Sequence, residues 1–160
     1  MSDGFTIKIE GMAELVDVLR TVTPRLRKRA ILNSLRAAGR LIRDIAAADR
    51  RADANTANPV SQYRRHGTVA AAIAVRTSRV AAAAGDIGVF INVRPLKTGG
   101  GAHNPNDPFY WRFLEFGTKF AAARPFLQPA ALHLADALTV FEEKLSVQVQ
   151  KLETNGKDPL

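Results

Sequence analysis

A chain of 160 residues is long enough for one domain with a substantial hydrophobic core. Because the chain contains no cysteine, disulfides, thiolate metal sites and cysteine nucleophiles are excluded. The net charge of +8 indicates attraction to nucleic acid, membrane headgroups or an acidic protein, and a solvated helix face is the alternative explanation. The sequence shows neither a secretion signal nor an apolar stretch of membrane-spanning length, so we expect a soluble, non-exported protein without membrane contact.

The first predicted element is a strand at residues 5–10, where Phe5, Ile7 and Ile9 alternate with polar side chains. A period of two is typical of a strand with one buried face. Gly11 ends this strand, and the apolar residues that follow recur at helical spacing. They predict a short helix up to Arg20.

A long helix is predicted over residues 24–50, with Thr23 as N-cap and Pro24 in the first turn. One side of this helix is apolar along its length. Arginines repeat on the other side, so the helix has a basic back. The apolar stripe is formed by Ile31, Ser34, Leu35, Ala38, Leu41, Ile42 and Ile45. The candidate contacts of the basic face with DNA or with an acidic neighbour are Arg29, Arg36, Arg40 and Arg43.

The middle of the chain alternates between loops and strands. Residues 51–66 show neither period and contain Asn, Pro and Ser, which predicts a long loop. Residues 67–77 and 85–94 are predicted to be paired strands. A second loop, rich in Gly and turn formers, is predicted at residues 96–106.

Residues 109–130 hold most of the aromatic residues of the chain. Asp107 and Pro108 predict the start of a helix, and Gly117 is placed to end it in a left-handed conformation. Nearly every position of this helix is aromatic or Leu, so we expect it to be covered on most sides, between layers or at an interface between chains. A strand over the same residues is the alternative.

A C-terminal helix completes the predicted elements. Its apolar stripe is formed by Leu127, Ala131, Leu134, Leu138, Phe141, Leu145 and Leu152. Residues 154–160 are expected to be a flexible tail. The predicted fold is therefore a single α+β domain over residues 1–153, in which a small, mainly antiparallel sheet of three or four strands packs against the long helix and the C-terminal helix.

The sequence lacks the spacings that mark catalytic and metal sites. His66, His103 and His133 are far apart, and the glycines at 99–101 are not followed by the Lys-Ser or Lys-Thr of a phosphate-binding loop. Glu115 is the one acid among the aromatic residues, and one interpretation is that it acts as a general acid. A structural role is favoured, through hydrogen bonds to backbone donors or a salt bridge to Arg112. We expect no enzymatic activity, cofactor or metal.

The segment 109–130 resembles a hallmark of the tail-completion or head-tail joining (neck) proteins of long-tailed bacteriophages, the family typified by gene product ten of a lambda-like phage. The hallmark reads Tyr-x-x-Phe-hydrophobic-Glu-Phe-Gly-Thr, followed by Arg-Pro-Phe-Leu-x-Pro-Ala. The matching residues are Tyr110, Phe113, Leu114, Glu115, Phe116, Gly117, Thr118, Arg124, Pro125, Phe126, Leu127, Pro129 and Ala130.

This resemblance implies a structural virion protein that forms a ring, expected to be a hexamer, at the head-tail junction. Its partners would be copies of itself, neighbouring neck or tail-terminator and tail-tube proteins, and genomic DNA in the channel. It would act in the virion and assemble in the host cytoplasm. We interpret the aromatic segment as a rigid corner, in which Gly117 supplies a turn while Pro125 and Pro129 fix the start of the last helix.

A non-specific nucleic-acid-binding protein that uses the basic helix face is the main alternative. The basic region lacks interleaved aromatic residues that could stack on bases, and no known reading-head motif is present. Salt-dependent binding by a monomer would favour this alternative, whereas concentration-dependent assembly would favour the ring.

Overall fold

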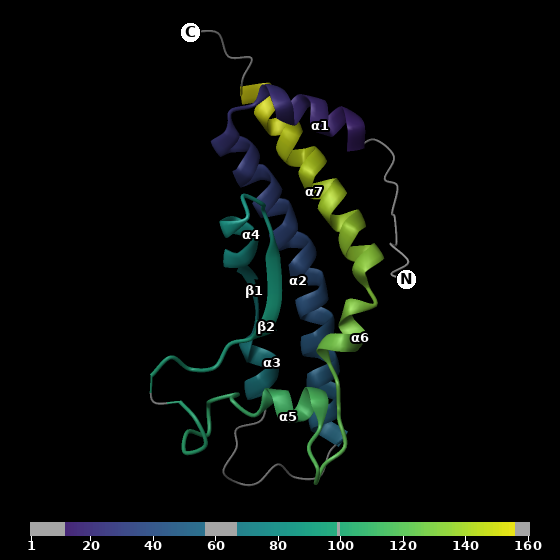
Figure 1. Ribbon diagram of the computed structural model, residues 1–160. Helices are drawn as coiled ribbons and strands as arrows, with labels where there is room; N and C mark the ends of the chain where they lie inside the picture. Colours follow the sequence, from purple (N-terminus) through teal and green to yellow (C-terminus); the bar gives the residue numbers. More distant parts are fainter. Residues whose placement is uncertain (1–11, 57–66, 99, 156–160) are drawn as a thin grey trace, which may run out of the picture.

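The computed structural model describes residues 12–56, 67–98 and 100–155. Two long helices, α2 (Pro24–Thr56) and α7 (Leu134–Asn155), pack along one another at its centre (Figure 1). Helix α1 (Met12–Thr21) packs against α7, and a small antiparallel sheet lies against α2. The fold is α+β, as predicted, and about 61% helical. Within the described ranges, no helix combines the length and apolarity needed to cross a membrane.

The predicted apolar stripe of α2 is the side on which its neighbours pack. Ser34 is completely buried, and its Oγ donates a hydrogen bond to the carbonyl of Ala30 at 3.0 Å. Gly39 lies where the sheet crosses the helix, because a Cβ there would lie 2.9 Å from Cγ1 of Val75. Small residues along α2 thus allow close approach of the sheet and of α7.

Helix α2 continues through residues 51–56, which the sequence pattern placed in a loop. That part of the prediction is wrong. Arg51, Ala52 and Ala54 favour a helix, and the first residue that opposes one is Pro59. The rest of the predicted loop, residues 57–66, lies outside the described residues.

The sheet consists of β1 (Ile73–Thr77) and β2 (Val89–Val93), which pair antiparallel in the register Ile73 to Val93. The short helix α4 (Arg79–Ala83) connects them, and Ser78 caps it by accepting a hydrogen bond from the N–H of Ala81 at 3.1 Å. Two strands are thus described where three or four were expected, and the predicted strand 5–10 lies outside the described residues.

The first half of the predicted strand 67–77 is instead helix α3 (Thr68–Ala72). Its three alanines have high helix propensity, and the helical turn buries Val69 and Ala70 in the core beside α2. Packing against α2 therefore determined the conformation of residues 68–72, although a weak period-two pattern predicted a strand. Gly67, at φ 75°, begins the helix with a left-handed conformation.

The predicted C-terminal helix is divided into α6 (Leu127–Ala131) and α7. Between them, the N–H groups of Leu132 and His133 bond to carbonyls three residues earlier, at 3.0 and 3.2 Å. This tighter turn changes the direction of the chain and lets α6 pack against α2. At its other end α7 extends to Asn155, into the segment expected to be a tail.

The main core lies where α2, α3, the sheet and α6 meet. Phe126 is its largest fully buried side chain, directly before α6. A second cluster joins Ala30 of α2 to Leu145 and Val149 of α7, with residues of α1 packed against it. The aromatic segment is therefore anchored in the main core through Phe126.

Candidate functional site

The candidate site is the aromatic corner, defined as residues 110–130. It comprises α5 (Trp111–Phe116), an irregular turn over residues 117–126, and α6. The corner lies at the end of the molecule opposite α1 (Figure 1). Helix α5 begins three residues after the predicted Asp107–Pro108 start, because residues 109–110 form a turn first.

Glu115 holds the two helices of the corner together. Its side chain is 3% exposed, and Oε2 accepts hydrogen bonds from the N–H groups of Phe126 and Leu127 at 2.9 and 3.0 Å. Oε1 accepts another from the N–H of Gln128 at 2.9 Å. These donors lie at the start of α6, where helical N–H groups have no intrahelical acceptor. A carboxylate on α5 therefore caps α6 and complements its positive end.

The predicted bond of Glu115 to backbone donors is confirmed, and the alternative salt bridge to Arg112 is not formed. Arg112 is exposed, and its guanidinium lies over the ring of Trp111 at 5.5 Å. The two side chains have different surroundings, since Glu115 is buried and Arg112 faces solvent.

Gly117 adopts φ 73° and ψ −178°. The predicted positive φ is confirmed, but the ψ value places the residue in an extended region that is essentially restricted to glycine rather than in the left-handed helical region. A Cβ at this position would lie 2.8 Å from the backbone N of Ala123 and 3.0 Å from the carbonyl O of Ala121. The chain can return beside α5 here only because there is no side chain.

Thr118 organises the turn that follows. Its Oγ1 accepts hydrogen bonds from the N–H groups of Phe120 and Ala121 at 3.2 and 3.1 Å, and its own N–H donates to the carbonyl of Ala121 at 2.9 Å. The N–H of Arg124 then donates to the carbonyl of Leu114 at 2.7 Å. Glu115, Gly117 and Thr118 each therefore have a distinct role in shaping the corner.

The prolines and the remaining aromatic residues frame this turn. Pro125 is exposed just before α6, and Pro129 lies in its first turn, where a missing N–H costs no intrahelical bond. Tyr110 packs against the main core and makes an edge contact with Phe109, at 5.8 Å between ring centroids.

Three phenylalanines of the corner remain in solvent: Phe113 is 55% exposed, Phe116 66% and Phe120 86%. We call these three residues the aromatic face. Helix α5 is therefore not covered between layers of the same chain, and its place at an interface between chains stays a prediction. At 3.6 residues per turn, Phe113 and Phe116 lie about 60° apart around α5, on the side turned away from Glu115. Helix α5 thus buries its one acid and exposes its phenyl rings.

The basic face of α2 is partly committed to contacts within the chain. Arg36 donates to Oγ1 of Thr77 at 3.1 Å, which ties α2 to β1. Arg43 binds Oδ1 of Asp44 through Nε and Nη2, at 2.9 and 2.7 Å. Arg29 and Arg40 are exposed on the same side of the helix. They are the two predicted arginines best placed for an external anion.

Asp107 has a structural role other than the predicted helix start, because it binds the preceding loop and not the first turn of α5. It is buried, and its carboxylate accepts hydrogen bonds from the N–H groups of Leu96, at 3.3 Å, and Gly101. The described residues of loop 96–106 are therefore arranged around a carboxylate, although the composition of the loop predicted flexibility. The sequence signal for this role is an Asp directly after a Gly-rich and Asn-rich stretch.

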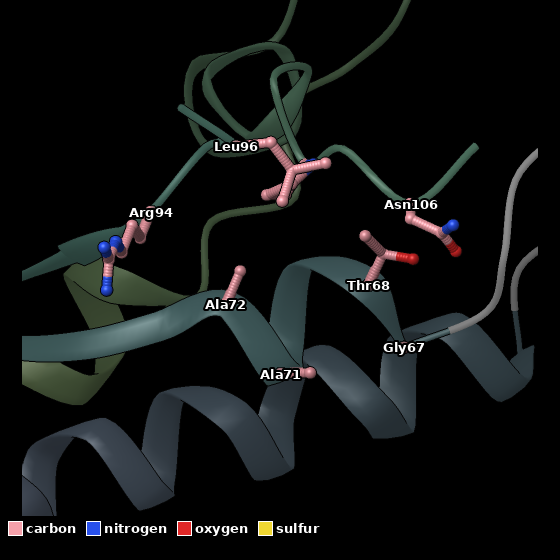
Figure 2. Close-up of a pocket in the computed structure, with 8 residues that line it drawn as sticks. Gly67, Thr68, Ala71, Ala72, Arg94, Leu96 and Asn106 are labelled. Carbon is pink, nitrogen blue, oxygen red and sulfur yellow. The ribbon is translucent and has the colours of Figure 1, made fainter. Parts of the chain in front are cut away.

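A depression of about 370 Å³ lies between α3 and this loop (Figure 2). Figure 2 shows Arg94 at one end and Thr68 and Asn106 at the other. The residues that line it include no carboxylate, imidazole or thiol, so they offer no acid–base pair. Across the described ranges, no three His, Cys, Asp or Glu side chains form a group that could hold a metal ion.

The described residues define an α+β protein with three exposed phenyl rings on a corner that hydrogen bonds of Glu115 and Thr118 hold together. Comparison of the chain with family models, with curated proteins and with solved structures finds no match.

Proposed function

We propose that this chain is a structural virion protein that forms a hexameric ring at the phage head-tail junction, where it completes the tail and joins it to the head. The observation that carries the proposal is the orientation of α5, which buries Glu115 and exposes Phe113 and Phe116. The resemblance of residues 110–130 to neck proteins supplies the biological context.

The energetics of the corner favour a docking surface. Burying a phenylalanine side chain contributes about 1.5–3 kcal/mol, so three exposed rings leave a substantial free energy that a partner can gain. The backbone beneath them is held by Glu115, Gly117 and Thr118. A preorganised surface loses little conformational entropy on association.

A ring requires a heterologous contact, in which one surface of each copy binds a different surface of the next. A corner of fixed geometry suits this contact, because small errors in the angle between successive copies would prevent the ring from closing. The proposed partners are the next copy in the ring and the adjoining neck, tail-terminator and tail-tube proteins, with assembly in the host cytoplasm. The exposed Arg29 and Arg40 offer contacts to DNA in the channel or to an acidic neighbour.

Sedimentation velocity and negative-stain microscopy over a range of protein concentrations test this proposal. We expect concentration-dependent rings for the natural sequence and monomers for the double variant Phe113→Gln, Phe116→Gln, with an unchanged melting temperature. Val80→Gln is the matched control, because Val80 is an exposed apolar residue on α4, away from the corner. A natural chain that stays monomeric throughout, or a double variant that assembles normally, would contradict the proposal.

Non-specific nucleic-acid binding is the second candidate, and the exposure of Arg29 and Arg40 on one side of α2 favours it. It predicts that the monomer binds duplex DNA with an affinity that falls steeply with salt. DNA binding without assembly at any concentration would select this function over the ring.

A further inference from the structure

An apolar groove of about 390 Å³ lies between β2 and α7, with α2 as its floor. Its described lining consists of glycine and apolar residues, to which all three elements contribute. Leu35 and Ile42 of α2, Val89 and Ile91 of β2, and Leu138 of α7 are representative. We call it the β2–α7 groove. Such a lining has few groups that could orient a polar ligand, so the groove suits apolar side chains.

The groove has room for two phenyl rings. An apolar cavity of about 150 Å³ holds one benzene molecule, so about 390 Å³ is enough for two. Its length agrees with this estimate. The residues of α2 that line the groove run from Leu35 to Ile42, a distance of about 10 Å along the helix axis.

Helix α5 presents a matching pair of rings. Phe113 and Phe116 are 55% and 66% exposed, and at a spacing of three residues their Cβ atoms lie about 5–6 Å apart. The described lining of the groove includes no residue of the aromatic corner, which lies at the end of the molecule opposite α1 (Figure 1). A second copy of the chain is therefore needed to bring these rings into a groove.

The exposed charges of the aromatic corner are all positive. Arg112, Lys119 and Arg124 are exposed, whereas Glu115 is buried. Two of the cations lie over aromatic rings of the corner, Arg112 at 5.5 Å and Lys119 at 4.6 Å from the ring centroids. A surface that binds this corner should therefore combine an apolar centre with carboxylates at its rim.

The β2–α7 groove has carboxylates beside its lining. Asp86 is exposed and directly precedes the lining segment 87–91, and the half-buried Glu142 directly follows the lining residues of α7. Of the arginines on α2 and β1, Arg36 is bound to β1, and Arg76 lies over a ring of β2. The two carboxylates complement the cations that flank the phenyl rings of the corner.

We propose that the β2–α7 groove of one copy receives Phe113 and Phe116 of the next copy. This inference rests on the proposed ring and names the two surfaces that form its repeated contact. Because the two surfaces differ, each bound pair keeps one free groove and one free aromatic face. Further copies can therefore add until the ring closes.

Sedimentation velocity of the groove variant Phe90→Gln, Leu134→Gln tests the receiving surface. Both side chains line the groove but are 40% and 54% exposed, so we expect an unchanged melting temperature. The concentration needed for assembly should rise at least tenfold, because the contact loses apolar burial. Val80→Gln, Val147→Gln is the matched control, since both valines are exposed outside the described lining. If the groove variant melts at a lower temperature, Leu134→Gln alone replaces it.

A mixture of two variants tests the pairing directly. Phe113→Gln, Phe116→Gln keeps its groove and the groove variant keeps its aromatic face, so the two should form pairs that cannot grow into rings. In NMR spectra, ring currents should shift the methyl signals of Ile42 and Leu138 in the labelled first variant when the unlabelled groove variant is added. The methyl signals of Leu145, in the second cluster, should not shift. Addition of an unlabelled sample of the first variant is the control and should shift none of them.

Rings formed by the groove variant at the concentration that suffices for the natural chain would overturn this inference and leave the ring proposal intact. A mixture without methyl shifts would also overturn it, because the groove would then be closed to a second copy. A natural chain that stays monomeric would contradict the ring, whereas methyl shifts in the mixture would still support the contact.

Discussion

Glu115 and Phe126 form a buried link between two helices, in which the carboxylate of the first accepts a hydrogen bond from the backbone N–H of the second at 2.9 Å. The ring of Phe126 fills the main core while its backbone is held by α5. The orientation of α5, and with it the aromatic face, is therefore coupled to the core of the protein.

Replacement of Glu115 tests this link. Glu115→Ala leaves the N–H groups at the start of α6 without their acceptor, so we expect a loss of about 3 kcal/mol in the free energy of unfolding. Glu115→Gln should lose less, because its amide oxygen remains an acceptor. Urea denaturation measures both, with Glu143→Ala on the exposed side of α7 as the control. An unchanged midpoint for Glu115→Ala would show that the cap contributes nothing.

Gly117→Ala should destabilise the fold by about 2–3 kcal/mol, since it combines an unfavourable backbone conformation with a Cβ placed 2.8 Å from Ala123 N. Gly85→Ala separates these causes. Gly85 also has a positive φ, of 84°, but nothing lies within 4 Å of its added Cβ, so about 1 kcal/mol is expected. Thermal unfolding of both variants measures the two effects. Equal losses in the free energy of unfolding would mean that the added Cβ at residue 117 is accommodated without destabilising the fold.

Asp107→Ala should open the loop 96–106 to proteolysis, because the N–H groups of Leu96 and Gly101 lose their acceptor. Limited trypsin digestion followed by mass spectrometry should detect faster cleavage after Lys97, which is exposed in this loop. Asp86→Ala, at an exposed position beyond α4, is the control and should cleave at the natural rate. If Asp107→Ala is cut no faster than this control, the carboxylate does not order the loop.

Reversal of Arg29 and Arg40 to Glu should leave the free energy of unfolding within about 0.5 kcal/mol of its natural value, because both side chains are exposed. If the ring proposal is correct, the yield of infectious particles should nevertheless fall, since charge complementarity steers such contacts. A matched reversal of exposed Arg79 and Lys144 should leave the yield unchanged. A normal yield after reversal of Arg29 and Arg40 would show that the basic face is only a solvent-exposed surface without a partner in the particle.

The elements that the sequence determined by itself are those with a long and unambiguous pattern. The stripe from Ile31 to Ile45 predicted the buried side of α2, and the alternation of residues 87–93 predicted the strand β2. Gly117 was predicted to have a positive φ from its place after an aromatic helix, and it does. In these cases the local pattern and the tertiary packing favour the same structure, so the local pattern was sufficient.

Tertiary structure decided the segments whose local pattern is short or uniform. In α5 nearly every residue is apolar, so periodicity could not show which side faces the core. That side was determined by Glu115, because its carboxylate reaches the free N–H groups of α6 from one face only. Residues 68–72 became helical for a similar reason, since Ala permits either structure and burial of Val69 beside α2 favours the helix. A short segment has too few local interactions to determine its own conformation, so the free energy of packing against distant parts of the chain determines it.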